Sequence, residues 1–133
     1  MKEIVDFLNA NPMGSLATVE NNKPQLRPWG FMFEQDGKFW FCTANTKPVF
    51  KQLKNNPAIA FCSTSKEMVT VRITGSVHFS QDPVIKQTII NHSDLVKSIY
   101  QTADNPIFEA FCVEHGEATL SDFSGNPPKK FTF

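Results

Sequence analysis

Residues 31–43 read FMFEQDGKFWFCT, and this stretch decides the fold because two apolar runs flank the turn residues Asp36 and Gly37. An Asp-Gly pair between two β-rich runs is a strong short-range signal for a tight hairpin. The second run, Lys38 to Thr43, is an apolar segment with three successive aromatic residues, which is typical of a strand. The stretch therefore predicts two antiparallel strands joined at Asp36 and Gly37.

Upstream of this hairpin, the sequence predicts a helix and a further strand pair. Residues 2–10 place apolar side chains at helical spacing, which indicates a short amphipathic helix that ends at Asn9 to Pro12. The runs 14–19 and 24–33 are separated by the polar turn 20–23, and this arrangement predicts a hairpin. The first half of the chain is thus expected to be a three-stranded meander.

Downstream, a short helix interrupts the strands. It is expected to start with Thr46 as its cap and Pro48 in its first turn, and Asn55-Asn56-Pro57 ends it. The remaining predicted strands are 58–62, 68–79, 108–113, 118–123 and 130–133, and the remaining predicted helices are 82–91 and 94–100. The segment Glu114 to Gly116, which contains His115, is expected to be a turn.

Strands in hairpins with few helices favour an antiparallel barrel over a doubly wound sheet. No glycine-rich phosphate loop follows the first strand, so the nucleotide-binding fingerprints are missing. A chain of 133 residues suits one core. The prediction is a single domain over residues 1–133, mainly β with peripheral helices (α+β).

Composition narrows the classes of partner. The chain has 13 Lys and Arg against 13 Asp and Glu, so it has no overall field that would attract nucleic acid or an anionic membrane. No apolar run reaches the roughly 20 residues of a membrane span, and acidic residues interrupt the N-terminal apolar residues. Cys42, Cys62 and Cys112 are widely spaced within apolar runs, as expected of buried thiols in a reducing compartment. We therefore expect a cytoplasmic protein.

The chain has two arginines, and both fall within predicted strands. Arg27 shares a strand face with Trp29 and Phe31, and a charge among aromatic residues needs either solvent or an anion. An arginine at the surface that covers an aromatic ring is an equally good interpretation of Arg27. Arg72 alternates with threonines, which favours a solvated or interface arginine.

The start of the helix near Lys47 is a second candidate anion site. Free backbone N–H groups and the helix dipole favour an anion at this point. Lys47, Lys51 and Lys54 recur at i, i+4 and i+7, which places them on one helix face. The alternative is a solvated lysine face opposite a packed apolar stripe.

No catalytic residue can be assigned from the sequence. His78, His92 and His115 lack the spacing of metal ligands, so no metal site is expected. The cysteines lie in predicted strands rather than at helix starts that would lower their pKa.

The order of the motifs is more specific than any one of them. The motifs are GSLATV (14–19), LRPWG (26–30), FCT (41–43), TKPVFKQLK (46–54), NNP (55–57), VRI (71–73) and DFSGNP (122–127). In this order the chain resembles the pyridoxamine 5′-phosphate oxidase-like family of FMN-binding split barrels, particularly its compact single-domain members. The match runs over nearly the whole chain.

The resemblance implies a six-stranded antiparallel split barrel that works as a homodimer with FMN at the interface. By position, Arg27 would meet the FMN phosphate, and Pro28 and Trp29 would lie alongside the flavin. Cys42 and Thr43 would line the ring system or the ribityl chain. Lys47, with either Lys51 or Gln52, would close the phosphate site. A small barrel this rich in aromatic residues is also expected to expose an apolar patch, as an interface does.

One departure bears on activity. The family's true oxidases carry an arginine in a C-terminal segment that grips the substrate, whereas this chain has no arginine after Arg72. The resemblance therefore implies an FMN-dependent oxidoreductase that acts on some other small molecule. The alternatives are a flavin carrier or redox sensor without turnover, and a barrel that binds another anionic cofactor such as haem or a deazaflavin.

Overall fold

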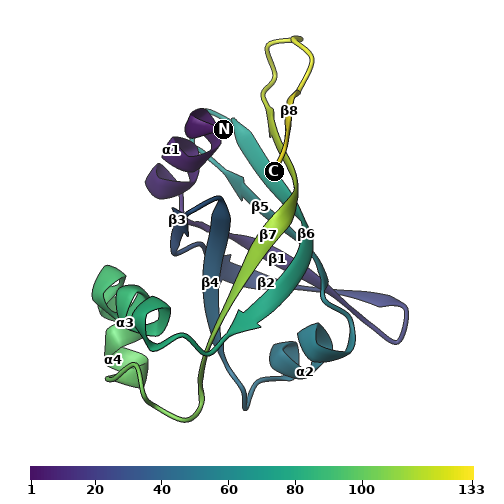
Figure 1. The fold of residues 1–133 in the computed structure, drawn as a ribbon. Helices are drawn as coiled ribbons and strands as arrows, with labels where there is room; N and C mark the ends of the chain where they lie inside the picture. Colours follow the sequence, from purple (N-terminus) through teal and green to yellow (C-terminus); the bar gives the residue numbers. More distant parts are fainter.

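The computed structural model describes residues 1–133 as one eight-stranded antiparallel sheet with four helices around it (Figure 1). The elements are α1 (Lys2–Ala10), β1 (Met13–Glu20), β2 (Lys23–Gly30), β3 (Phe33–Gln35), β4 (Lys38–Ala44), α2 (Pro48–Asn55), β5 (Ala58–Thr64), β6 (Thr70–Ser80), α3 (Pro83–His92), α4 (Asp94–Tyr100), β7 (Phe108–Ser121) and β8 (Lys129–Thr132). The strand order is β2-β1-β5-β6-β7-β4-β3, with β8 paired to β7. The sheet curls without closing, which confirms the expected split barrel. None of the helices has the length and apolar character that a membrane span requires.

The sheet has eight strands rather than the expected six. The prediction of a three-stranded meander in the first half of the chain is also wrong. The run 24–33 is divided, because β2 ends at Gly30 and the chain crosses to a different part of the sheet. At the crossing, the Phe31 N–H donates to Pro12 O at 2.8 Å and the Met32 N–H donates to Trp40 O at 3.0 Å. Consequently β2 pairs with β1, whereas β4 pairs with β3 and β7.

Both tight hairpins form as expected. Asn21 and Asn22 have φ angles of 51° and 62°, and Asp36 and Gly37 have φ angles of 54° and 77°. Positive φ angles at both central residues are typical of a type I′ turn, whose twist matches that of the two flanking strands. Asn, Asp and Gly adopt positive φ angles most easily.

The turn expected at residues 114–116 is wrong, because β7 is one continuous strand from Phe108 to Ser121. Gly75 of β6 pairs with Gly116, whereas Val77 pairs with Val113, so β7 has one more residue than β6 between these two pairs. Such a bulge lets the strand bend and shifts its in-out alternation by one residue. Val113 and Ala118 therefore both face the core.

The helices follow the sequence except at the start of α2. The N-cap of α2 is Lys47, which makes no side-chain capping bond, so the expected cap by Thr46 is wrong. By contrast, Asp82 and Ser93 cap α3 and α4 by accepting from the Val84 and Val96 N–H groups. The start of α2 therefore keeps its backbone donors unpaired by any capping side chain.

Two apolar clusters lie on opposite sides of β4. Phe39 and Phe41 point into the barrel core, where Phe41 stacks on Phe111 with ring centroids 5.6 Å apart. Trp40 points the other way, into a second cluster beneath α3 and α4. Helices α1 and α2 pack against the barrel core through Ile4, Leu8, Val49 and Leu53. The helix pair α3–α4 thus covers the outer side of β4 and of the first part of β7.

Candidate functional site

Arg27 is held in a fixed position beneath α2. Alternation along β2 places it on the inward face, where its two terminal nitrogens donate to Leu16 O at 3.1 Å and to Gln52 Oε1 at 2.8 Å. Gln52, only 7% exposed, also accepts from the Thr18 hydroxyl at 2.6 Å. Desolvation by burial lowers the pKa of Arg27 from its ordinary value, but a guanidinium stays charged at neutral pH. Two of its five donors are used, so the others can bind a ligand.

The cations near Arg27 have no acidic partner. Lys47 lies at the start of α2, with its ammonium 5.6 Å from the centroid of the Trp29 ring. Lys51 is exposed on the next turn of α2. The salt bridges of the chain involve only Lys2, Lys38 and Lys129. Together with the uncapped helix start, these charges favour an anion.

Lys54 serves a different purpose from Lys47. Its ammonium lies over the rings of Phe50 and Phe79, at 5.8 and 5.1 Å from their centroids. The three lysines that recur along α2 therefore divide between two groups of aromatic residues.

A pocket of about 420 Å³ has Lys47 in its lining, whereas Arg27, Lys51 and Gln52 do not line it. Pro28, Trp29, Cys42 and Lys47 line it, as do side chains of α3 and α4 on its other wall. Most of the lining is apolar, and it contains no carboxylate. A larger hollow of about 530 Å³ at the start of α3 is lined mainly by polar residues and contains none of the predicted site residues. Cofactor pockets are mostly apolar with a few placed polar groups, so we assign the candidate site to the smaller pocket.

Two acidic groups of the pocket lining, the Cys42 thiol and the Tyr100 hydroxyl, are held neutral. Desolvation by burial raises the pKa of the Cys42 thiol to about 12, and Lys47 only partly opposes the shift. Burial also raises the pKa of Tyr100, and Cys42 adds to that rise. A protonated thiol is a poor nucleophile, so Cys42 forms a neutral wall of the pocket.

The structure separates Cys42 from Thr43. Successive residues of a strand point to opposite faces, and only Cys42 lines the pocket. Thr43 is 1% exposed, and its hydroxyl has no hydrogen-bond partner within the protein. An unpaired buried hydroxyl costs stability until a water or a ligand atom bonds to it.

His92 lines the pocket and was not among the residues predicted from the sequence. It is the last residue of α3, and its ring lies edge-on to Phe33 with centroids 5.7 Å apart. No local pattern marks it, because only the packing of α3 and α4 against the sheet brings this helix end to the pocket. The structure brings together no group of three or more His, Cys, Asp or Glu residues that could hold a metal ion.

Comparisons with known proteins agree with this architecture. A family model described as pyridoxamine 5′-phosphate oxidase matches residues 1–120. The structure of a NimC/NimA family protein from Clostridium acetobutylicum is 31% identical, with a TM-score of 0.91, and the match covers 100% of this chain and 92% of that one. No curated protein matches the chain.

Two more distant structures share the fold. A pyridoxamine 5′-phosphate oxidase-related, FMN-binding protein from Nostoc punctiforme is 15% identical, with a TM-score of 0.75 over 98% of this chain and 84% of that one. A haem-binding protein from Mycobacterium smegmatis is 17% identical, with a TM-score of 0.76 over 98% of this chain and 56% of that one.

Proposed function

Since the chain belongs to the pyridoxamine 5′-phosphate oxidase family and is 31% identical to one NimC/NimA family protein, we propose that it binds FMN and acts as an oxidoreductase on a small molecule. The observation that carries this proposal is that Lys47, which has no acidic partner, lines a mostly apolar pocket together with Trp29, a near neighbour of Arg27 on β2. A phosphate needs the first feature and a flavin ring system needs the second.

The residues present fit FMN. Arg27 and Lys47 would hold the phosphate together with Lys51, and Gln52 would act through Arg27, which it already positions. Pro28, Trp29 and Cys42 would lie against the flavin ring system.

Bound FMN would supply hydride or electron transfer, and the protein would supply orientation and electrostatics. With Cys42 and Tyr100 neutral, the pocket has no negative charge that would repel a reduced, anionic ring. A small aromatic or nitro compound and a reduced nicotinamide are candidate reactants.

We further propose that two copies form the working unit, with FMN touched by both, in the cytoplasm. Exposed apolar side chains at the pocket rim, Met13 (65%), Leu95 (68%) and Ile99 (59%), support this proposal because a second copy would cover them.

The phosphate assignment is tested by the Arg27→Ala/Lys47→Ala double variant in equilibrium titrations with FMN and with riboflavin, which lacks the phosphate. We expect FMN affinity to fall by about 100-fold or more, because each charge-assisted hydrogen bond contributes roughly 1.5–3 kcal/mol. Riboflavin affinity should hardly change. Lys54→Ala is the matched control, because Lys54 lies over Phe50 and Phe79. Full FMN affinity in the double variant would refute the assignment.

Anaerobic mixing of the FMN-loaded protein with NADH or NADPH tests whether the protein is a reductase or only a flavin carrier or redox sensor. Bleaching of the flavin absorbance by either nucleotide supports a reductase. If neither bleaches it, a flavin carrier or redox sensor becomes the better proposal.

Haem is a second candidate cofactor, and His92 favours it because imidazole is a common axial ligand of haem iron. Titration with haemin distinguishes the two cofactors. Under the FMN proposal, His92→Ala leaves FMN affinity within about threefold of wild type, since the phosphate contacts dominate binding. Under the haem alternative, the same variant loses the Soret shift that wild type shows.

A further inference from the structure

A hollow of about 200 Å³ lies between the β3–β4 hairpin and the first turn of α3. We call it the hairpin hollow. Its lining comes from β3 and β4, from the turn that joins them, and from residues 80–85, whereas no residue of the candidate site lines it. Its volume is that of roughly seven water molecules, so it has room only for a small ligand.

Trp40, which lines the hairpin hollow, has an unpaired hydrogen-bond donor. The residue is only 4% exposed, and its indole N–H has no hydrogen-bond partner within the protein. An indole N–H can only donate, and a buried donor without an acceptor costs free energy. Phenylalanine would fill the same place without that cost. A ligand that supplies the acceptor would therefore account for the tryptophan.

One cation lies next to Trp40 in the lining. Lys38 is two residues away on β4, so its side chain leaves the strand on the same face. Its ammonium lies 3.6 Å from a carboxylate oxygen of Glu114, but the two side chains are 38% and 41% exposed, and such exposed pairs contribute little to stability. Lys38 can therefore pair with the carboxylate of a ligand at little cost.

Two carboxylates also border the hairpin hollow. Asp36 lies in the hairpin turn and forms no salt bridge. Asp82 caps α3 through Oδ1, which accepts from the Val84 N–H at 2.9 Å, and its Oδ2 forms no hydrogen bond within the chain. A purely anionic ligand would be repelled by these carboxylates. A ligand with only an ammonium group would leave the Trp40 N–H without an acceptor.

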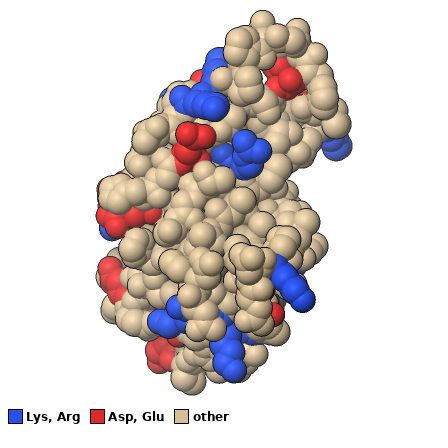
Figure 2. Space-filling model, turned by 90° about the vertical axis from the view of Figure 1, so that its right-hand side faces the viewer, with Lys and Arg blue, Asp and Glu red and all other residues tan.

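No other charged residue lines the hairpin hollow. Lys86 of α3 donates instead to Gln81 Oε1 at 3.0 Å and to Phe108 O at 2.9 Å. The chain has no net charge, and on the side drawn in Figure 2 the positive and negative groups are interspersed. The local groups, rather than a field of the whole protein, therefore decide which ligand the hollow favours.

We propose that the hairpin hollow binds a small zwitterion with the carboxylate and ammonium groups of a free α-amino acid. The ligand carboxylate accepts from the Trp40 N–H and pairs with Lys38, while the ligand ammonium pairs with Asp36 and Asp82. Charge-assisted hydrogen bonds of this kind are stronger than those between neutral groups. Ile85 also lines the hollow and offers contact to a short aliphatic side chain. None of these residues is assigned to FMN, so the site is independent of the proposed function.

The two tryptophans of the chain, Trp29 and Trp40, allow a direct test by NMR. Each gives one indole N–H resonance in the isotope-labelled protein, and Trp40→Phe identifies them because it removes one. In a titration of wild type with L-alanine, the Trp40 resonance should shift and reach saturation. The Trp29 resonance is the internal control and should hardly move, because Trp29 lines the candidate site instead.

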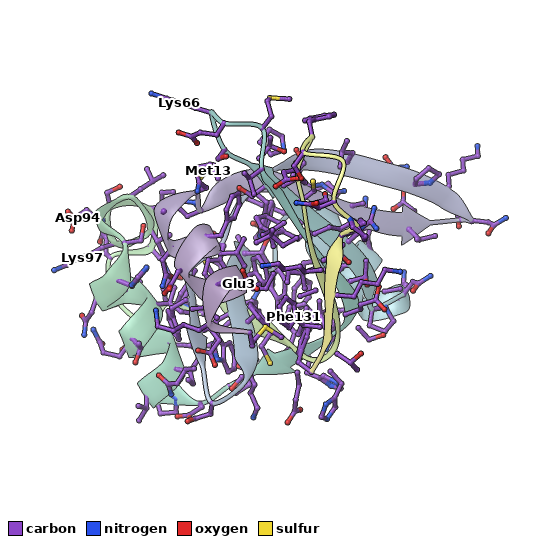
Figure 3. The ribbon with its side chains drawn as sticks, turned by 90° about the horizontal axis from the view of Figure 1, so that it is seen from above. Glu3, Met13, Lys66, Asp94, Lys97 and Phe131 are labelled. Atoms are coloured by element: carbon purple, nitrogen blue, oxygen red, sulfur yellow. The ribbon has the colours of Figure 1, made fainter.

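Isothermal titration calorimetry measures the affinity for L-alanine. Trp40→Phe keeps an aromatic ring but loses the donor, so binding should weaken by about tenfold or more, and Lys38→Met should weaken it by about as much. Lys97→Met is the matched control, since it removes the same charge from α4, which contributes no residue to the hollow (Figure 3). Acetate and ethylammonium each carry only one of the two charges, and each should bind about tenfold or more weakly than L-alanine.

Each outcome supports or overturns the site. If L-alanine does not move the Trp40 resonance, the proposal is wrong. Equal affinity of Trp40→Phe and wild type would place the ligand elsewhere and would also overturn it. Acetate that binds as tightly as L-alanine would make the hollow a site for an anion rather than for a zwitterion. Thermal melting checks that each variant is folded. Arg27 and Lys47 do not line the hollow, so the FMN titrations remain a separate test.

Discussion

Gln52 shows how one side chain organises the candidate site. Its carbonyl oxygen accepts from Arg27 on β2 and from Thr18 on β1, so it joins the helix to both strands of the hairpin. Leu16 O takes a second Arg27 donor. The guanidinium is therefore positioned before any ligand arrives, which lowers the entropy that binding would otherwise cost.

Gln52→Leu is predicted to lower the free energy of unfolding by about 1–3 kcal/mol, because it leaves the Thr18 hydroxyl and an Arg27 donor unpaired. Urea denaturation measures the change. Thr18→Val combined with Gln52→Leu should recover part of the loss, since one unpaired group is then removed. A single variant as stable as wild type would show that water replaces these bonds at no cost.

Among the elements, β1 and β5 approach closely because Gly14 has no side chain. A Cβ at Gly14 would lie 2.3 Å from the carbonyl oxygen of Cys62, which is backbone and cannot move aside. β1 joins the β2 edge, which bears Arg27 and Trp29, to the rest of the sheet. The position of the candidate site thus depends on this close contact.

Gly14→Ala is predicted to destabilise the protein by about 3 kcal/mol, the upper part of the range for an overpacked site. Gly30→Ala is the control, because its Cβ would meet only the flexible side chains of Met13 and Met32, at 3.3 and 3.4 Å. Its cost should stay below about 1 kcal/mol. Chemical denaturation of both variants checks the difference, and equal costs would contradict the role assigned to the close approach.

At the scale of the whole molecule, a salt bridge joins α1 to β8, because Lys129 Nζ lies 3.2 Å from Glu3 Oε2. Figure 3 labels Glu3 on α1 and Phe131 on β8. Helices α3 and α4 form a separate layer over the second cluster. That layer keeps three ionisable groups neutral. Burial is the main cause that raises the pKa of Cys42 to about 12, of Cys112 to about 11, and of Tyr100 above its ordinary value.

Stability is therefore predicted to fall as the pH rises above about 9. The unfolded chain releases the thiol protons near pH 9, whereas the folded chain keeps them until about pH 11 to 12. Between these values the unfolded state binds fewer protons, so the free energy of unfolding decreases as pH increases. Urea midpoints at pH 7 and pH 10, with reductant present, measure the fall. The Cys42→Ala/Cys112→Ala variant should show a smaller fall, and an equal one would contradict this origin.

The sequence by itself determined most of the helices and hairpins and the fold class. Asp36 and Gly37 predicted their hairpin, the helices predicted over 82–91 and 94–100 form as α3 and α4, and the motif order indicated a split barrel. These predictions succeeded because turn geometry, capping and periodicity depend on neighbours along the chain. The predicted site residues stay predictions, although the structure brings Arg27, Trp29, Lys47 and Gln52 to one region.

Only the tertiary structure decided which strands pair and what lines the pocket. Alternation tells which side of a strand is apolar, but the choice of β7 as the partner of β4, and the bulge in β7, depend on contacts between distant residues. For the same reason, the structure was needed to separate Cys42 from Thr43 and to bring His92 to the pocket. Apolar burial is not directional, so a local pattern cannot specify which distant surface will cover it.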